Sequence, residues 1–532
     1  MKKIFHKPYL ESMLTFNRAV LLSAVVIAAM TTAGCSSFLD KDPTFIVKEN
    51  YYTNEEEVNI GLTGIYGALG NEYIYGSSLV YHLSMSDEGV WQRNNALTGP
   101  EVYVFDPSDE AVRNLWKYLY EGIERANVFL ERIDAADMDE TKKNIAKGQA
   151  KFLRAYFYFV LTTNYGSVPL KTTPTYSVND VNISGASLTA LYDFITSEME
   201  EAESMVESIA AYGHAGRVTK SAVRGILARV YLKMAGAPLN DHSKYEDVVK
   251  WTDKLVNPTG SDYPHQLAPD YIQLFKDMAA DEYNIDESIW EVEFFGNRMG
   301  DFEGGRHGNI AGIQFTQETS DTLGYSYGFI LGTRKLYAHY GSDDTDVRRD
   351  WNISPYAYNN QTGAAMERDE IDNRFSAKFR RNYEEVLPRH KNYTPINFPL
   401  LRFADVLLMY AEAKNELGET EEAGQKVTMV RERAHANDST AHILNQEDMR
   451  QFIRNERYRE LAFEGLRKFD LIRWGTFVNT MSALAKDIDQ NTPQGRKYTA
   501  FGPRNVSNRH VLLPIPLDEL SLNREMRQNL GW

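Results

Sequence analysis

The stretch LLRFADVLLMYAEAKNELGETEEAGQKVTMVRERA, residues 400–434, predicts a pair of antiparallel helices. Its apolar residues recur at helical spacing on both sides of Gly418, where a tight turn is expected. The small side chains of Ala411 and Ala413 let a second helix pack closely against the first. We therefore expect helices over Leu400–Leu417 and Glu421–Ala434.

Two more helix pairs are expected earlier in the chain, from the same 3.6-residue period. They are residues 112–133 with 147–161, and residues 188–206 with 219–234. In the last of these, Ala222, Gly225 and Ala228 leave room for close helix approach. Residues 411–423 resemble the tetratricopeptide signature, but no clean 34-residue period recurs elsewhere. The pattern favours a degenerate helical-repeat scaffold.

Residues 237–399 have a different character, with frequent Pro and Gly, short apolar runs and many Tyr, Asn and Asp residues. We expect a loop-rich lobe here, between a mainly helical scaffold over residues 46–236 and 400–475. A few strands are predicted, such as residues 288–295, where Ile289, Glu291 and Glu293 alternate with Trp290, Val292 and Phe294. Long irregular insertions on a compact scaffold tend to be functional.

The N-terminus predicts export and lipid attachment. Basic residues precede an apolar run at residues 19–30, which is too short for a spanning helix, and Thr32-Ala33-Gly34-Cys35 resembles a lipobox. We predict that residues 1–34 are a signal peptide, that Cys35 is lipidated, and that residues 35–45 form a tether. The alternative is a secreted protein with one spare thiol, and Met13 offers a second possible start.

Composition and net charge limit the classes of partner that this protein is expected to bind. The net charge of −16 argues against nucleic acid, whose phosphates require a basic surface, and against a polybasic membrane contact. The single cysteine excludes an internal disulfide, so stability must come from a packed core. Because no long Gly, Ser or Pro linker follows the tether, residues 46–532 are expected to form one domain.

After Cys35 and NYY at 50–52, the chain carries in order the motifs LWKYLYEGIERAN (115–127), AKFLRAYFYFVLTTNYGSVPL (150–170), GRVTKSAVRGILARVYLKMAG (216–236), LLRFADVLLMYAEAKNELG (400–418), IRNERYRELAFEGLRKFDLIRWG (453–475) and LLPIPLDELSLNREMRQNLGW (512–532). This order of motifs resembles the SusD/RagB family of surface lipoproteins over essentially the whole mature sequence. The resemblance implies a mainly α fold, in which tetratricopeptide-type helix pairs support a loop-rich binding lobe with few short strands.

The same resemblance implies function. Such proteins sit on the outer leaflet of the outer membrane and act as the capture partner and lid of a SusC-like, TonB-dependent porin, holding oligosaccharides or other nutrients for import. The family is not catalytic and uses no cofactor. Asp40 and Asp42 suit the surface-export signal of these lipoproteins.

Chemistry-bearing motifs are otherwise sparse. Glu456, Glu460 and Glu464 recur at i+4, as a carboxylate pair for glycoside cleavage would, but nearby arginines would hold them ionised, which favours an ion-pair network that joins helices. Arg402, Asp405 and Glu412 are interpreted in the same way. No zinc, nucleophile or phosphate-loop motif occurs. Asp343, Asp344 and Asp346 could converge on a structural calcium ion, although solvated turn charge is the preferred interpretation.

Sugar recognition needs aromatic faces for the C–H face of a pyranose and polar groups for its hydroxyls. Two regions offer this mixture: Asp87, Trp91, Gln92, Arg93, Asn94 and Asn95, and the loops with Tyr325, Tyr327, Trp351, Tyr356 and Tyr358. Each aromatic residue could instead be a core anchor, and for Trp91 the two interpretations are balanced.

Three classes of function remain open. A glycan-capturing lipoprotein partnered with a porin is preferred. The alternatives are the same scaffold binding peptides or glycopeptides, and a periplasmic helical-repeat adaptor that binds only protein. A glycosidase is the enzyme alternative, which turnover of a polysaccharide would establish.

Overall fold

The computed structural model describes residues 52–177, 181–296, 303–317, 321–341, 345–436 and 444–532. Residues Tyr52–Trp532 form one compact unit. Cys35 and the predicted signal peptide and tether lie outside the described residues. The expectation of a mainly helical chain with few short strands is confirmed.

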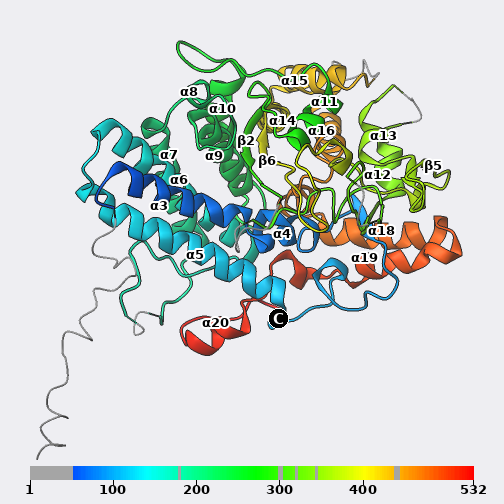
Figure 1. Cartoon of the computed structure of the whole chain (residues 1–532), viewed down its shortest axis with the longest axis horizontal. Helices are drawn as coiled ribbons and strands as arrows, with labels where there is room; N and C mark the ends of the chain where they lie inside the picture. Colours follow the sequence, from blue (N-terminus) through cyan, green and yellow to red (C-terminus); the bar gives the residue numbers. More distant parts are fainter. Residues whose placement is uncertain (1–51, 178–180, 297–302, 318–320, 342–344, 437–443) are drawn as a thin grey trace, which may run out of the picture. The chain divides into compact units, whose positions relative to one another are not determined.

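Most of the long helices pack against another long helix that is near in sequence (Figure 1). They are α3 (Glu55–Gly67), α5 (Glu110–Arg132), α6 (Glu140–Tyr165), α7 (Leu188–Met205), α9 (Lys220–Ala235), α10 (Lys244–Val256), α11 (Tyr271–Ala280), α14 (Phe403–Glu416), α15 (Thr420–Arg433), α16 (Gln446–Glu460) and α18 (Phe477–Asn491). Neighbouring pairs include α5 with α6, α6 with α7, α7 with α9, α9 with α10, and α14 with α15. The predicted helix pairs are therefore present.

Short helices fill the connections between the long ones. They are α4 (Ser78–Tyr81), α8 (Ile209–Tyr212), α12 (Arg334–His339), α13 (Arg348–Asn352), α17 (Arg467–Arg473), α19 (Phe501–Asn505) and α20 (Leu517–Leu522). Three two-stranded antiparallel sheets complete the described fold. They pair β1 (Gly89–Trp91) with β3 (Ile330–Gly332), β2 (Ser288–Val292) with β6 (Phe398–Arg402), and β4 (Tyr356–Tyr358) with β5 (Ala365–Glu367).

Local sequence explains where the central helices begin and end. Asp109 caps α5 by accepting hydrogen bonds from the backbone of Ala111 and Val112, and Asp139 caps α6 in the same way. Helix α6 ends at Gly166, whose φ of 77° is strained for any residue with a side chain. Almost the whole circumference of the second half of α6 is buried, as its continuous apolar run predicts.

Two expectations about the chain need correction. The predicted helix over 400–417 begins only at Phe403, because the preceding residues pair with β2 as strand β6. The 237–399 region also holds more helix than expected: α10 buries Val248, Trp251 and Leu255 on one face and packs on α9 and α14 as part of the scaffold.

Strand β2 also differs from its prediction. It ends at Val292, and all five of its residues are buried, so the alternating pattern does not mark a solvent face. Trp290 packs 4.8 Å from Tyr156 and 5.2 Å from Phe152, measured between ring centroids. Glu291, on the opposite side of the strand, accepts a short hydrogen bond from the Ser288 hydroxyl. The strand is therefore inserted between other elements of the core.

Candidate functional site

A groove with a cavity volume of about 440 Å³ is assembled from four separate stretches of chain. Its walls are Gln92, Arg93, Asn94, Asn95, Gln314, Thr316, Tyr325, Tyr327, Phe329 and Tyr498. The first four follow β1 and the three aromatics at 325–329 precede β3. The structure thus brings together two regions that the sequence predicted separately as binding residues.

The pairing of β1 with β3 explains this meeting. Trp91 lies opposite Ile330 in an antiparallel ladder, so the chain leaving β1 runs beside the chain entering β3. The backbone N–H of Gln92 extends the ladder by donating to the carbonyl of Phe329 at 2.9 Å, and its side-chain amide donates to the carbonyl of Gly328. These bonds fix the two walls of the groove relative to each other.

Aromatic side chains form one wall. The rings of Tyr325 and Tyr327 meet edge to face with centroids 4.9 Å apart, and Tyr327 stacks on Phe329 at 4.7 Å. All three side chains are only half-buried. A row of partly exposed rings in a concave surface offers apolar faces on which a sugar ring can stack.

Polar groups hold this wall in place. The Tyr327 hydroxyl donates to Asn392 at 3.1 Å, and the Gln314 amide donates to the Tyr327 carbonyl at 3.1 Å. On the opposite side, the Tyr498 hydroxyl donates to the carbonyl of Gln92 at 2.6 Å. The side chains of Asn94 and Asn95 are exposed at the rim, where their amides can both donate and accept.

Trp91 lies beneath the groove. Only 8% of it is exposed, and its ring packs between His82 at 5.3 Å and Phe329 at 5.0 Å. It lines a smaller adjoining cavity of about 180 Å³ together with Glu101 and Tyr103. Of the two interpretations left open by the sequence, the geometry favours the core anchor.

Asp87 does not face the groove. Its carboxylate is fully buried and accepts from Arg467 at 2.8 Å and from Lys335 at 2.9 Å. Burial alone would raise its pKa, but these two cations outweigh burial and lower the pKa to about 2. The expectation that Asp87 contacts ligand is corrected, because both of its oxygens are bonded within the protein.

Trp351, Tyr356 and Tyr358 form a separate cluster and are not among the residues that line the groove. Trp351 is buried, donates from its indole to the carbonyl of Lys378 at 3.1 Å, and lies 3.8 Å from the Arg380 guanidinium. Arg380 also donates to the Tyr356 hydroxyl. The expectation that these aromatics share a site with Tyr325 and Tyr327 is corrected, since strand β4 pairs with β5 instead of extending the groove.

Sequence reasoning did not single out Gln314, Thr316, Phe329 or Tyr498 as binding residues. Phe329 follows directly on the aromatic stretch that contains Tyr325 and Tyr327, so its position was a usable signal. Tyr498 lies near the C-terminus in sequence but lines the groove, and no local sequence pattern predicts that contact.

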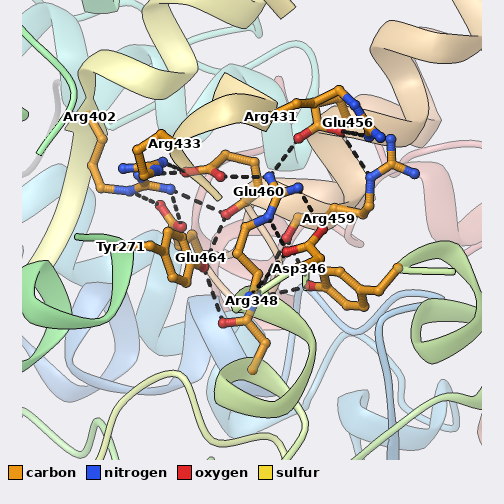
Figure 2. A network of polar contacts seen from close by, with 12 residues as sticks. Tyr271, Asp346, Arg348, Arg402, Arg431, Arg433, Glu456, Arg459, Glu460 and Glu464 are labelled. Atoms are coloured by element: carbon orange, nitrogen blue, oxygen red, sulfur yellow. Dashed lines mark hydrogen bonds and ion pairs between the residues drawn. The ribbon is translucent and has the colours of Figure 1, made fainter. Parts of the chain in front are cut away.

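The predicted ion-pair network is confirmed (Figure 2). Arg348 donates to Glu456 at 2.5 Å, to Glu460 at 2.9 Å and to both oxygens of Asp346. Arg402 joins Glu460 and Glu464 and also reaches Glu287, next to β2. The network therefore links α16 to segments far away in the sequence.

Arginine charge decides the ionisation of these carboxylates. Burial would raise the pKa of Glu460, but Arg433, Arg402 and Arg348 lower it to about 2. Arg348, Arg459 and Arg431 likewise overcome burial and hold the pKa of Glu456 well below its usual range. A general acid needs the opposite shift, so these glutamates are suited to structural ion pairing.

Asp405 and Glu412 on α14 also act as the sequence predicted. Asp405 pairs with Arg457 at 2.7 Å and with Arg229 at 2.6 Å, and Glu412 pairs with Arg473. Burial alone would raise the pKa of both carboxyl groups, but the arginines outweigh it and lower each pKa to about 2.

The described part of the chain contains no cluster of three His, Cys, Asp or Glu side chains arranged to hold a metal ion. Asp343 and Asp344 of the predicted calcium loop lie outside it, and Asp346 is bonded to Arg348. Among the described helices, none is long and apolar enough to span a bilayer.

The sequence profile of the SusD family matches residues 286–532, and a second profile, described as "Starch-binding associating with outer membrane", matches residues 37–232. The chain is 27% identical to SusD-like protein P25 of Formosa agariphila, over 92% of this chain and 94% of that one. It is 24% identical to the starch-binding protein SusD of Bacteroides thetaiotaomicron, over 96% and 98% of the two chains.

A solved SusD homologue from Bacteroides thetaiotaomicron superposes with a TM-score of 0.81 at 27% identity, covering 91% of this chain and 98% of the homologue. The chain therefore belongs to the SusD/RagB family, as its motif order predicted.

Proposed function

We propose that this protein captures oligosaccharides in the groove between β1 and β3. The observation that carries the proposal is the row of half-buried rings of Tyr325, Tyr327 and Phe329, which line one concave surface together with the exposed amides of Asn94 and Asn95. The rings supply stacking faces and the amides supply in-plane hydrogen bonds. The names of a starch-binding relative and of the matching profile support a carbohydrate ligand.

The proposed setting is the outer membrane. Cys35 would carry the lipid anchor that holds the mature chain on the cell surface, and a SusC-like TonB-dependent porin would receive the captured ligand beneath this protein acting as its lid. The profile name that refers to the outer membrane supports this location. The anchor would be the only membrane contact, and nucleic acid is not a partner.

The proposed role is binding without turnover and without a cofactor. It is supported by the network glutamates, whose pKa values are lowered by arginines instead of raised for acid catalysis. The residues of the groove that can be described include no carboxylate that could serve as acid or nucleophile.

Binding can be tested with a Cys35→Ser chain, which cannot be lipidated, by affinity electrophoresis through gels that contain plant, host or microbial polysaccharides. Retardation by one glycan should be abolished in Tyr327→Ala, because the central stacking face is lost. Tyr176→Ala is the matched control, since Tyr176 is 67% exposed and outside the groove. Trp91→Ala should weaken retardation only through loss of packing, visible as a lower melting temperature.

The same experiment separates the alternatives. Retardation that survives in Tyr327→Ala would move the site away from this groove. No retardation by any glycan, with a folded protein, would contradict glycan capture and favour peptide binding or the protein-binding adaptor. Release of reducing sugar would contradict the non-catalytic role.

A further inference from the structure

The charge of the groove differs from that of the whole chain. The protein has a net charge of −16, yet none of the described residues that line the groove is acidic and one, Arg93, is cationic. Neutral sugars are commonly bound with the help of carboxylates, which accept hydrogen bonds from hydroxyl groups. The described walls of the groove contain no carboxylate, and they contain one positive charge, that of Arg93.

Arg93 is presented to solvent without a compensating charge. Its guanidinium lies 4.3 Å from the centroid of the Phe329 ring, so a cation–π contact holds it at the groove wall. The side chain is exposed, and among the residues that can be described it has no carboxylate partner within ion-pair distance. Its planar N–H donors are thus available to a ligand that enters the groove.

Two more arginines contact residues next to the groove: Arg496 contacts Tyr498, and Arg368 contacts Phe375, whose ring lies beside Gly328. Arg496 donates to the Tyr498 hydroxyl at 3.1 Å and also to the side chain of Asn373, and Tyr498 in turn lines the groove. Arg368 stacks on Phe375, with its guanidinium 5.6 Å from the ring. Burial, and after it the charge of Arg496, lower the pKa of Arg368.

Neither of these arginines has a carboxylate partner in the part of the chain that the structure describes. This contrasts with the core of the same molecule, where Arg348 and Arg402 are each surrounded by carboxylates. Water and salt screen partly exposed charges of this kind, and an anionic ligand that enters the groove would be attracted to them.

We propose that the groove selects oligosaccharides that carry anionic groups, either uronate carboxylates or sulfate esters. This inference rests on the proposed glycan-binding function and names the class of glycan. Arg93 contacts the anion directly through its planar N–H pair, and the positive potential of Arg496 and Arg368 favours the same charge. The aromatic wall stacks on the sugar ring that bears the group.

The test compares three oligosaccharides of similar length by isothermal titration calorimetry with the Cys35→Ser chain: an oligogalacturonate, a carrageenan oligosaccharide and laminarihexaose. They carry carboxylates, sulfate esters and no charge, respectively. One of the two anionic ligands should bind more tightly than laminarihexaose, and which one does identifies the anion. Its affinity should fall as NaCl rises from about 0.05 to about 0.5 M, because salt screens exposed charges.

Substitutions test whether Arg93 supplies the charge that binds the anionic ligand. Arg93→Gln should weaken binding of the anionic ligand about tenfold, the effect of losing one charge-assisted hydrogen bond. Arg93→Lys should retain part of the affinity. Arg527→Gln removes an equal charge from an exposed arginine that donates to the backbone carbonyls of Arg524 and Met526, and it should leave affinity unchanged.

Two outcomes would overturn the inference in distinguishable ways. Binding of laminarihexaose that Tyr327→Ala abolishes, with neither anionic ligand bound more tightly, would exclude anion selection but leave glycan capture intact. An absence of binding by all three ligands and by the polysaccharide panel would remove the proposed function and this inference together.

Discussion

At the residue scale, two adjacent carboxyl groups in one buried loop take opposite charge states. Asp87 is held ionised by Arg467 and Lys335. Glu88 has no ion pair with a described residue, and its carboxyl group accepts hydrogen bonds from the backbone of Phe463 at 3.3 Å and from the Ser86 hydroxyl at 3.3 Å. Burial, together with the charge of Asp87, raises the pKa of Glu88 to about 8 even though Arg467 opposes the shift. Glu88 is therefore mainly protonated in the folded protein at neutral pH.

This difference predicts a pH effect on stability. The ordinary pKa of Glu88 is 4.5, so between pH 4.5 and 8 the folded state binds a proton that the unfolded state releases. Stability from this group is therefore lost as pH rises through that window, by about 1.4 kcal/mol per pH unit. Glu88→Gln replaces the protonated carboxyl group with a neutral side chain of the same shape. The free energy of unfolding of the variant, relative to that of the wild type, should therefore increase from pH 5 to pH 8.

Denaturant unfolding at pH 5, 6.5 and 8 measures this difference. Glu56→Gln is the control, since Glu56 is exposed on α3, and its curve should run parallel to that of the wild type. Parallel curves for Glu88→Gln as well would show that Glu88 is ionised in the folded state, contrary to the expectation.

At the scale of elements, the helices pack more closely than ordinary side chains allow. A Cβ atom at Gly122 of α5 would lie 2.7 Å from the ring of Phe157 on α6. Phe157 is fully buried, so the ring has little room to move. By contrast, a Cβ atom at Gly64 in α3 would meet nothing within 4 Å. The two glycines therefore offer the same substitution in a crowded and in an open helix.

Gly122→Ala should destabilise the protein and Gly64→Ala should stabilise it. Alanine gains about 1 kcal/mol of helix propensity over glycine at either site. At Gly122 overpacking costs about 1–3 kcal/mol, and because the 2.7 Å contact is with a fully buried ring we expect the upper part of this range, a net loss of about 1–2 kcal/mol. Thermal unfolding followed by circular dichroism measures both variants, and equal stabilisation would show that α5 and α6 can separate without cost.

Helix pairs could be predicted from sequence because their signal is local and periodic. The stripe of Leu115, Leu119 and Ile123 defines α5 without reference to the rest of the chain. The small residues of α9 were interpreted as room for another helix. At Gly225 the room is taken by Leu401 of strand β6, since a Cβ atom there would lie 2.3 Å from a methyl group of Leu401. The close approach was predictable, but the neighbour was not.

The groove could be predicted in part for the same reason. Residues 92–95 and Tyr325 and Tyr327 have suitable chemistry, which is visible in sequence, and the structure places them together. Their meeting depends on the register of Trp91 opposite Ile330, a pairing between distant segments that no local pattern contains. Asp87 had suitable chemistry too, but its burial under Arg467 and Lys335 is equally non-local.

At the scale of the whole molecule, buried charges join segments that are remote in sequence. Asp87 is tied to Lys335 and Arg467, while Arg402 is tied to Glu287 and Glu460. Large chains commonly unfold through intermediates. In this protein the buried ion pairs join distant segments of the unit formed by residues 52–532. If one half of the unit unfolded, buried charges in the other half would lose their partners. We expect one cooperative unfolding transition.

Arg348→Met tests this coupling. The variant leaves Asp346 without its arginine and removes one of the three arginines around each of Glu456 and Glu460. Removing one partner from a buried ion pair should cost about 3–5 kcal/mol. Because the network joins the scaffold to the loop-rich region, the melting temperatures from far-ultraviolet circular dichroism and from tryptophan fluorescence should fall together. Lys142→Met, which breaks an exposed pair with Glu55, should leave both nearly unchanged. A variant whose two probes melt at separate temperatures would show that the scaffold and the loop-rich region are stabilised independently, and that the network serves only the elements it touches.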